Sequence, residues 1–571
     1  MIFATELAAA DPARQRIRAL THADETACLE GLAAEARLTP EAARRVRATA
    51  RRLVEEVRNR RPGGLDAFLH EYTLSSQEGV VLMCLAEALL RVPDAETRNL
   101  LIRDKIVPAD WRGHLGLSDS PFVNASTWAL MLTGRVMNEA DPGGVVRRLV
   151  SRGGEPLIRE ALTAGMRIMG RQFVMGRTIE EALDRARPAE KRGWRHSFDM
   201  LGEAARTARD ADRYMAAYAN AIRAVGRAAQ GRDPADAPGI SVKLSALHPR
   251  FEMAQRARVM AELAPRLQHL AGLARKAGIQ LCVDAEEADR LDLTLDVFEV
   301  AALDPALAGW NGLGLAVQAY QKRAPAVIDW LAGLARRANR RLPVRLVKGA
   351  YWDSEIKRAQ ERGLPGFPVF TRKVATDVSY IACARRLLAD ALAFQPQFAT
   401  HNAQTLATVL ELGEGVDYEF QRLHGMGETL YDQVIGQRPC RIYAPVGSHE
   451  DLLPYLVRRL LENGANTSFV NRIADADAPI ESLLADPVDE LAALAVKPHP
   501  AIRLPAELYA PERRNSRGID LNDPDSLATL GRQMAEATAH AWTAGPIVEG
   551  VERGEGEGRA ALDPSRRSRR V

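Results

Sequence analysis

The feature that most constrains the fold is an eightfold alternation of short apolar segments with helical stretches between residues 196 and 445. Near-continuous apolar strands separated by helices are typical of parallel sheets whose two faces are both covered. Eight such units predict a closed (βα)8 barrel over residues 191–475, in the α/β class. The segments with strand character are HSFDML (196–201), ISVKLS (240–245), QLCVDA (280–285), LGLAVQAY (313–320), PVRLVKG (343–349), PQFATH (396–401), DYEFQRL (417–423) and CRIYAP (440–445).

The rest of the chain divides around this predicted barrel. Before it, Ala, Leu, Arg and Glu dominate and apolar residues recur at three-to-four spacing, which predicts helices. We divide this all-helical region into an N-terminal arm (1–70) and a helical domain (71–190). Residues 476–545 have the character of a linker that leads into another unit. Residues 546–571 are charged and rich in glycine, which predicts a disordered tail.

Composition narrows the class of protein. The 571 residues carry 77 basic and 74 acidic side chains, so no global charge favours nucleic acid or anionic lipid. Five scattered cysteines without any CxxC argue against a disulfide framework or a zinc site, and fit a reducing compartment. The sequence shows neither a signal peptide nor a run of 18 apolar residues. We therefore expect a cytoplasmic protein, with peripheral contact at the inner face of a membrane left open.

Polar residues follow all eight predicted strands. In (βα)8 barrels the chemistry gathers at the C-terminal ends of the strands, and a purely structural barrel does not require polar groups at every exit. This pattern predicts a functional site at that end. DAEEAD (284–289) has no His or Cys at ligand spacing beside it, so we expect no metal. The exit residues are Glu203, Lys243, Asp284, Gln318, Lys348 with Tyr351, Thr400 with His401 and Asn402, Gln421 with His424, and Tyr443.

The segment PYLVRRLLENG (454–464) predicts the helix of the eighth unit. At about 100° per residue, Tyr455, Arg458, Arg459 and Glu462 share one stripe, opposite an apolar face. Arginine forks hold carboxylates bidentately, so this stripe and Lys243 would suit an amino or organic acid, although a solvated charged face is the alternative. Glu203 would neighbour this unit and could pair with one of the arginines, either as a gate or as a structural salt bridge.

Three further motifs carry cations and polar groups to neighbouring exits. RLVKGAYWD (345–353) contains Arg345, Lys348, a glycine that lets the backbone approach a ligand, and two aromatic residues. TRK (371–373) and THNA (400–403) follow. Each is weak alone, because basic residues at loop starts usually face solvent. Together they favour an anionic cofactor with a pyrophosphate, such as a dinucleotide across the barrel mouth.

Several long motifs closely resemble the proline utilization A family, and specifically its FAD-dependent proline dehydrogenase half, over roughly residues 10–530. They are EYTLSSQEGVVLMCLAEALLRVPD and SPFVNASTW in 72–130, and then SVKLSALHPR, DAEEADRL, VQAYQKR, RLVKGAYWDSEIKRAQ, FATHNAQT, LHGMGE, RPCRIYAPVG and YLVRRLLENGANTSFVNR. The resemblance implies a (βα)8 barrel with non-covalent FAD. It also implies oxidation of L-proline to Δ1-pyrroline-5-carboxylate, the first step of proline catabolism to glutamate, with electrons passing to a quinone.

The resemblance also implies roles for individual residues. It makes Asp284 a support for the cationic cluster and the flavin, and Glu203 the gate partner of Arg458. Residues that would bind L-proline are the carboxylate clamp Lys243, Arg458 and Arg459 and the ring contacts Tyr351, Leu423, Tyr443 and Tyr455. Residues that would line the FAD are Gln318, Arg345, Val347, Lys348, Gly349, Trp352, Thr371, Arg372, Thr400, His401, Asn402, Gln421 and Glu462.

The sequence departs from this family in two ways. Many members begin with a ribbon-helix-helix that binds DNA, but the first residues here show no such pattern, so we expect no DNA binding. After Trp542 no aldehyde dehydrogenase half follows, which leaves open a fragment of a bifunctional protein or a chain that stops early.

Two other functions stay open at the level of sequence. One is a Schiff-base aldolase or lyase that uses Lys243 or Lys348. The other is a silent fragment that binds proline and flavin without turnover. The electron acceptor, acceptance of hydroxyproline and assembly into a homo-oligomer also stay open.

Overall fold

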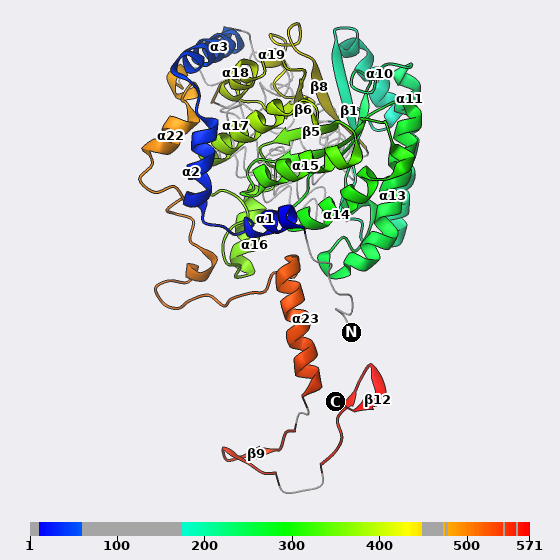
Figure 1. The fold of residues 1–571 in the computed structure, drawn as a ribbon, viewed down its shortest axis with the longest axis vertical. Coiled ribbons are helices and arrows are strands. Elements are labelled where there is room, and N and C mark those ends of the chain that lie inside the picture. Colours follow the sequence, from blue (N-terminus) through cyan, green and yellow to red (C-terminus); the bar gives the residue numbers. More distant parts are fainter. Residues whose placement is uncertain are drawn as a thin grey trace, which may run out of the picture.

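The computed structural model describes residues 11–59, 174–447, 472–473, 478–540, 543–554 and 558–570. Within these ranges, eight parallel strands form a closed barrel in chain order, and β1 pairs with β8 to close it (Figure 1). Each predicted strand overlaps an observed one, so the predicted (βα)8 barrel is confirmed. The strands are β1 (Trp194–Met200), β2 (Gly239–Val242), β3 (Leu281–Val283), β4 (Leu313–Gln318), β5 (Leu342–Val347), β6 (Phe394–Ala399), β7 (Glu419–Leu423) and β8 (Cys440–Val446).

Helices follow the strands and surround the barrel (Figure 1). The helix predicted at 454–464, after β8, lies outside the described residues. The described helices of the barrel region are α10 (Ile179–Glu190), α11 (Ala208–Ala229), α12 (Leu244–Leu247), α13 (Arg256–Ala277), α14 (Leu291–Ala302), α15 (Ala324–Ala338), α16 (Trp352–Glu361), α17 (Lys373–Ala389), α18 (Ala403–Leu412) and α19 (Glu428–Tyr431), with 3-10 turns η2 (Met253–Gln255), η3 (Ala288–Arg290) and η4 (Pro305–Leu307).

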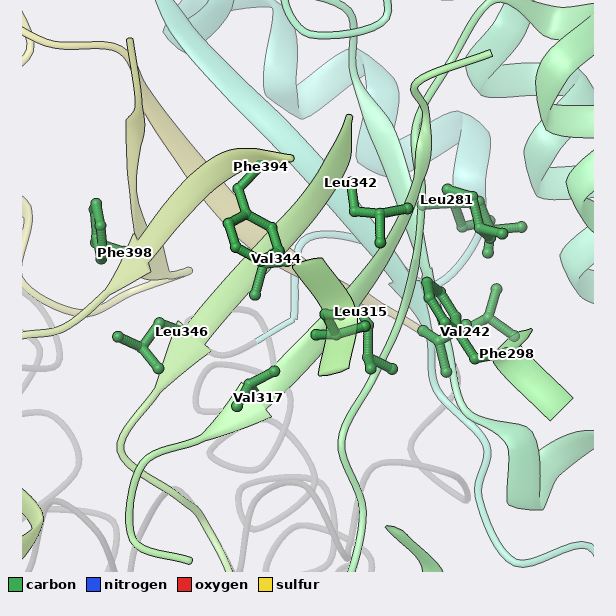
Figure 2. Packing of buried hydrophobic residues seen from close by; sticks show 14 of the residues in the cluster. Val242, Leu281, Phe298, Leu315, Val317, Leu342, Val344, Leu346, Phe394 and Phe398 are labelled. Carbon is green, nitrogen blue, oxygen red and sulfur yellow. The ribbon is translucent and has the colours of Figure 1, made fainter. Parts of the chain in front are cut away.

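The hydrophobic core lies mainly between the strands and the surrounding helices. Val242 of β2, Leu315 of β4 and Val344 of β5 belong to one buried cluster with Phe298 of α14 (Figure 2). Because strand side chains alternate, the residues between these apolar positions point into the barrel. Alternation thus separates an apolar outer layer from a polar interior.

The lower part of the barrel interior is held by a buried ion pair. Arg441 of β8 and Glu419 of β7 are each 1% exposed, and Arg441 Nε donates to Glu419 Oε1 at 2.7 Å. The same guanidinium donates to the backbone carbonyls of His196, Ala235 and Ala237. Burial alone would raise the pKa of Glu419, but Arg441 outweighs it and the pKa is lowered. This pair ties β7 and β8 to β1 beneath the site.

In the described part of the N-terminal arm, helices pack on the outside of the barrel: α1 (Pro12–Ala19), α2 (Glu25–Ala36) and α3 (Pro40–Asn59). Arg14 of α1 is buried and donates to the carbonyl of Asp292 on α14 at 2.8 Å. α2 contacts α17, and α3 contacts α18. The described part of the N-terminal arm is therefore helical, as predicted. Most of the predicted helical domain (71–190) lies outside the described residues.

The chain after the barrel runs along it and then away from it (Figure 1). The helices described there are η5 (Ile480–Leu483), α22 (Pro487–Ala493), η6 (Pro505–Glu507) and α23 (Pro524–Ala539). In the described parts of the chain, no helix is long and apolar enough to span a membrane.

The predicted disordered tail contains two short antiparallel pairs, β9 (Ile547–Val548) with β10 (Val551–Glu552), and β11 (Leu562–Asp563) with β12 (Arg566–Arg570). Nearly all their side chains are exposed, so these pairs have no core. Disorder of the tail and the proposed domain boundaries stay predictions.

Candidate functional site

A cavity of about 950 Å³ lies at the C-terminal ends of the barrel strands. Its size is at the upper end of the range for small-molecule and cofactor sites. Seventeen residues that the sequence singled out line it together, although the role of each stays a prediction. They are Lys243, Asp284, Gln318, Arg345, Val347, Lys348, Gly349, Tyr351, Trp352, Thr371, Arg372, Thr400, His401, Asn402, Gln421, Leu423 and Tyr443.

A buried charged cluster, which we call the axial cluster, lies at the inner end of this cavity; it comprises Lys243, Asp199, Asp284, Tyr443 and Arg345. Lys243 Nζ lies 2.8 Å from Asp199 Oδ2, 3.1 Å from Asp284 Oδ2 and 3.2 Å from Tyr443 Oη. Arg345 Nη1 donates to Asp284 Oδ1 at 2.6 Å. Each member of the axial cluster lies in a strand or directly after one, namely β1, β2, β3, β5 or β8. They meet because the inward positions of these strands converge on the barrel axis.

Electrostatics sets different protonation tendencies for the two carboxyl groups. Burial disfavours the Asp284 carboxylate, but Lys243 and Arg345 outweigh it and hold the pKa of Asp284 below its ordinary value. Burial raises the pKa of Asp199, where Lys243 opposes and the Asp284 charge reinforces the increase. For Lys243, burial is outweighed by Asp199, Tyr443 and Asp284, so its pKa is raised and the amine stays protonated.

Tyr443 bridges the two carboxyl groups of the axial cluster. Tyr443 Oη lies 2.7 Å from Asp199 Oδ2 and 2.6 Å from Asp284 Oδ2. A phenol has one proton and can donate to only one of these oxygens. Tyr443 and Lys243 thus hold the two carboxyl groups together, because both contact Asp199 Oδ2 and Asp284 Oδ2.

Arg345 crosses the barrel interior from β5. Its guanidinium donates to Gln421 Oε1 at 2.7 Å and to Ser241 Oγ at 2.9 Å, and it lies over the Tyr443 ring at 5.1 Å. Gln421 in turn donates to Glu419 at 2.8 Å, which connects the axial cluster to the ion pair beneath it. These contacts fix the position of Arg345, since a fully bonded guanidinium has little rotamer freedom.

A second group of cations surrounds the start of α17. Lys348 pairs with Asp377 and lies 3.1 Å from Thr405 Oγ1. The residue before α17, Arg372, makes no side-chain cap, and the cavity is lined by Thr371, Arg372 and Lys373. The first backbone N–H groups of a helix lack partners within the helix and attract anions. Burial lowers the pKa of Lys373, and an anion bound here would raise it again.

Aromatic residues form the wall that follows β5. Gly349 has φ +139°, and a Cβ there would collide with the ring of Tyr320, so only glycine fits. The sequence predicted that this glycine lets the backbone approach a ligand; the structure shows that it also makes room for Tyr320. Trp352 Nε1 donates to the carbonyl of Phe370 at 2.8 Å, which fixes the indole beside the cavity.

The exits of β6 and β7 are joined by His401 and Asn402. His401 Nε2 accepts a hydrogen bond from the backbone N–H of Leu423 at 3.1 Å. Asn402 caps α18 through its side chain, which accepts from Thr405 N at 2.9 Å. Both residues line the cavity from a backbone that these bonds hold in place.

Five predicted site residues are not placed in this lining. Tyr455, Arg458, Arg459 and Glu462 lie outside the described residues. Glu203 is described but does not line the cavity.

The structure also adds residues that the sequence did not single out. Asp199 is the next-to-last residue of β1 and lies on its inward side, and an acidic residue inside an otherwise buried strand was the available signal. Further lining residues are Tyr320, Thr376, Arg422, Met426, Glu490, Leu494 and His499, and Lys373 of the predicted TRK motif also lines the cavity.

Comparison with family models covers most of the chain. A model described as Proline dehydrogenase matches residues 182–472, and one described as Proline utilization A proline dehydrogenase N-terminal domain matches residues 11–58. A third, described as DNA-binding domain of Proline dehydrogenase, matches residues 64–173. This last description points away from the expectation of no DNA binding, which therefore stays an unconfirmed prediction.

Similar proteins and structures agree with these matches. The chain is 54% identical to the bifunctional protein PutA of Salmonella typhimurium and 51% identical to that of Rhizobium meliloti, over 96% of its length in both cases. It spans 43% and 46% of those proteins, less than half of each. A crystal structure of a Bradyrhizobium japonicum proline utilization A mutant is 51% identical, with a TM-score of 0.73, over 90% of this chain and 53% of that one. The chain therefore belongs to the proline dehydrogenase family of oxidoreductases and resembles the corresponding half of the bifunctional PutA proteins.

Proposed function

We propose that this protein is an FAD-dependent dehydrogenase that oxidises L-proline to Δ1-pyrroline-5-carboxylate. The observation that carries the proposal is one continuous cavity. It runs from the buried axial cluster around Lys243 to the cationic start of α17 at Lys373. A site of this shape can hold a small carboxylic acid at one end and an extended anionic cofactor beyond it.

The residues present fit FAD. A pyrophosphate needs cations and backbone N–H donors, and the start of α17 offers both beside Lys348 and Arg372. Trp352, Val347 and Gln318 provide apolar and amide surface between this region and the axial cluster. When bound, FAD would supply the two-electron acceptor for the hydride from the ring carbon next to the proline nitrogen.

The axial cluster would bind the substrate end. Lys243 is protonated and can attract the proline carboxylate, while Tyr443 offers a ring face for the pyrrolidine. Asp284 keeps Lys243 and Arg345 in place and balances part of their charge. Arg458 and Arg459, with Tyr455, are proposed to complete this clamp on the strength of the resemblance.

Loss of hydride requires the nitrogen lone pair, so the reactive substrate is the neutral amine, whose N–H proton leaves for solvent as the imine forms. The cations near the cavity favour this form over the ammonium by repulsion. We therefore expect kcat/KM for L-proline to rise with pH until the bound amine is fully deprotonated. A flat profile would contradict this description of the substrate.

The geometry does not favour a Schiff-base enzyme. A lysine must be neutral to attack a carbonyl, but Lys243 lies between two carboxyl groups that raise its pKa. Lys348 pairs with Asp377. By analogy with the family we extend the proposal to a quinone as electron acceptor. Assembly of the chain into oligomers is a further proposal of the same kind.

Turnover with product trapping tests the proposed function. The purified chain, supplied with FAD and a soluble quinone, would be incubated with L-proline and with an aromatic amino-aldehyde that condenses with cyclic imines. We expect the coloured adduct to accumulate with proline and not without it. Flavin-loaded protein that forms no adduct would instead indicate a silent fragment that binds without turnover.

A further inference from the structure

Part of the cavity lining comes from a segment beyond the family match. We call residues 486–499, which contain α22 and the turn after it, the C-terminal strap. Glu490, Leu494 and His499 of the strap line the cavity. The proline dehydrogenase model ends at residue 472, so it assigns no role to the strap.

Polar contacts attach the strap to predicted cofactor residues. The backbone N–H of His499 donates to Thr371 Oγ1 at 2.8 Å. Arg372 Nε donates to the carbonyl of Lys497 at 2.9 Å. Lys497 Nζ donates to the carbonyls of Leu491 and Leu494, each at 2.8 Å, which closes the end of α22. The residues that begin α17 therefore also determine where the strap lies.

Apolar packing supports the strap from the other side. Val488 and Leu491 are each 2% exposed and belong to a cluster with Phe370 and with Val378 of α17. Leu494, in contrast, is only half-buried and lines the cavity. The buried side chains of the strap thus hold its backbone in place, and Leu494 lines the cavity from this backbone.

The order of groups along the cavity indicates what the strap would contact. The redox-active ring must lie near the axial cluster, where the substrate carboxylate would bind, and the start of α17 suits the pyrophosphate. The part of FAD beyond the pyrophosphate is the adenosine. The strap lines the same cavity and contacts Thr371 and Arg372, directly beside the start of α17.

We propose that the C-terminal strap binds the adenosine half of FAD and makes the site select FAD over FMN. This inference rests on the proposed function. Leu494 supplies apolar surface for the base, and Glu490 supplies an acceptor for its amino group. His499 accepts from Ala501 N through Nδ1 at 3.2 Å, which leaves Nε2 as a donor for ribose or base.

Flavin binding to the apoprotein tests the inference independently of turnover. The full chain, stripped of flavin, would be titrated with FAD and with FMN, which has the same ring system but lacks the adenylate. The variants are Leu494→Ala and His499→Asn; asparagine keeps an acceptor for the turn at Ala501. The matched control is Val496→Ala, because Val496 is 58% exposed and does not line the cavity.

We expect each strap variant to raise the Kd for FAD about tenfold, as loss of one good contact would. The Kd for FMN should not change, so the ratio of the two should fall, whereas the control should keep the wild-type ratio. An unchanged FAD affinity, or equal weakening of both flavins, would overturn the inference. If the wild-type protein bound neither flavin, both the inference and the proposed function would be overturned. If it bound FAD but did not oxidise proline, only the proposed function would be overturned.

Discussion

Lys243 has two roles, one in the predicted substrate site and one in the stability of the barrel. It is 6% exposed and touches both Asp199 and Asp284, so its removal would leave two buried carboxyl groups facing each other. Buried ion pairs of this type add little net stability when complete, but breaking one by deleting a partner is strongly destabilising. Lys243 is therefore both a predicted substrate contact and a structural requirement of the barrel.

The substitution Lys243→Met should lower the free energy of unfolding by about 3–5 kcal/mol, because it leaves Asp199 without its cation. The loss should be smaller when Asp199→Asn is added, since the remaining carboxyl group is then removed. Chemical denaturation measures both values. Lys276→Met, at an exposed lysine, serves as the control. A double variant that is no more stable than the single one would contradict the assigned coupling.

The raised pKa of Glu355 should make the free energy of unfolding depend on pH. Burial raises the pKa of this carboxyl from 4.5 to about 7, although the N–H of Ala288 opposes the increase. The folded state thus binds a proton that the unfolded state releases, so stability is full below about pH 4.5 and falls as pH rises towards 7. At 1.36 kcal/mol per pKa unit, the total loss is roughly 3 kcal/mol.

The neutral variant Glu355→Gln should remove this part of the pH dependence. Its free energy of unfolding, measured by denaturant titration across the same pH range, should fall less than that of the wild type. Glu361→Gln, at an exposed position on the same helix, controls for the loss of a surface charge. Parallel pH profiles for the wild type and Glu355→Gln would show that folding does not raise the pKa of Glu355.

Sequence predicted many individual site residues but not their partners. Lys243 and Asp284 directly follow strands, where barrel geometry collects polar groups, and Tyr443 lies in the second half of the predicted strand 440–445, so the sequence predicted all three. Asp199 lies inside a strand, and its role depends on which inward residues of β2 and β8 face it. That register is a property of the closed barrel and has no local pattern in the sequence.

At the scale of elements, the N-terminal arm contributes to the site through α2. Its first residue, Glu25, accepts a hydrogen bond from the N–H of Thr371 at 3.0 Å. Leu29 of α2 packs in the same cluster as Phe370 and Val378, which also supports the strap. The arm therefore stabilises the start of α17, where the pyrophosphate is proposed to bind.

Substitution Leu29→Ala should lower the free energy of unfolding by about 2–5 kcal/mol, because Leu29 is 1% exposed and its loss leaves a cavity. The exposed neighbour Glu30→Ala should change it by less than about 0.5 kcal/mol. Denaturant titration of the full chain measures both. If Leu29→Ala behaved like Glu30→Ala, the arm would not unfold together with the barrel.

The type and order of the barrel elements were predictable, because buried parallel strands and amphipathic helices have different apolar periods. The ends of the elements were less predictable. The second strand was predicted to reach residue 245, but it ends at Val242, and α12 begins two residues later at Leu244. Over the strap, the sequence predicts only a linker. The apolar residues of the strap are buried because they pack on α17, more than 100 positions earlier in the chain, and local sequence patterns do not show such packing.

At the scale of the whole molecule, the described site joins three separated parts of the chain. The barrel supplies the axial cluster, α2 supports Thr371, and the strap adds residues to the cavity lining. The resemblance to PutA helped to predict this architecture from the sequence, since the shared motifs fall at the strand exits. The contacts between distant segments could be seen only in the structure.

The most direct test of the central claim is the visible absorbance of the FAD-loaded chain before and after L-proline is added without oxygen. We predict that the oxidised flavin band bleaches in the wild type. In FAD-loaded Lys243→Met, bleaching should require a much higher proline concentration. A wild-type flavin band that persists at saturating proline would contradict the claim that this cavity oxidises proline.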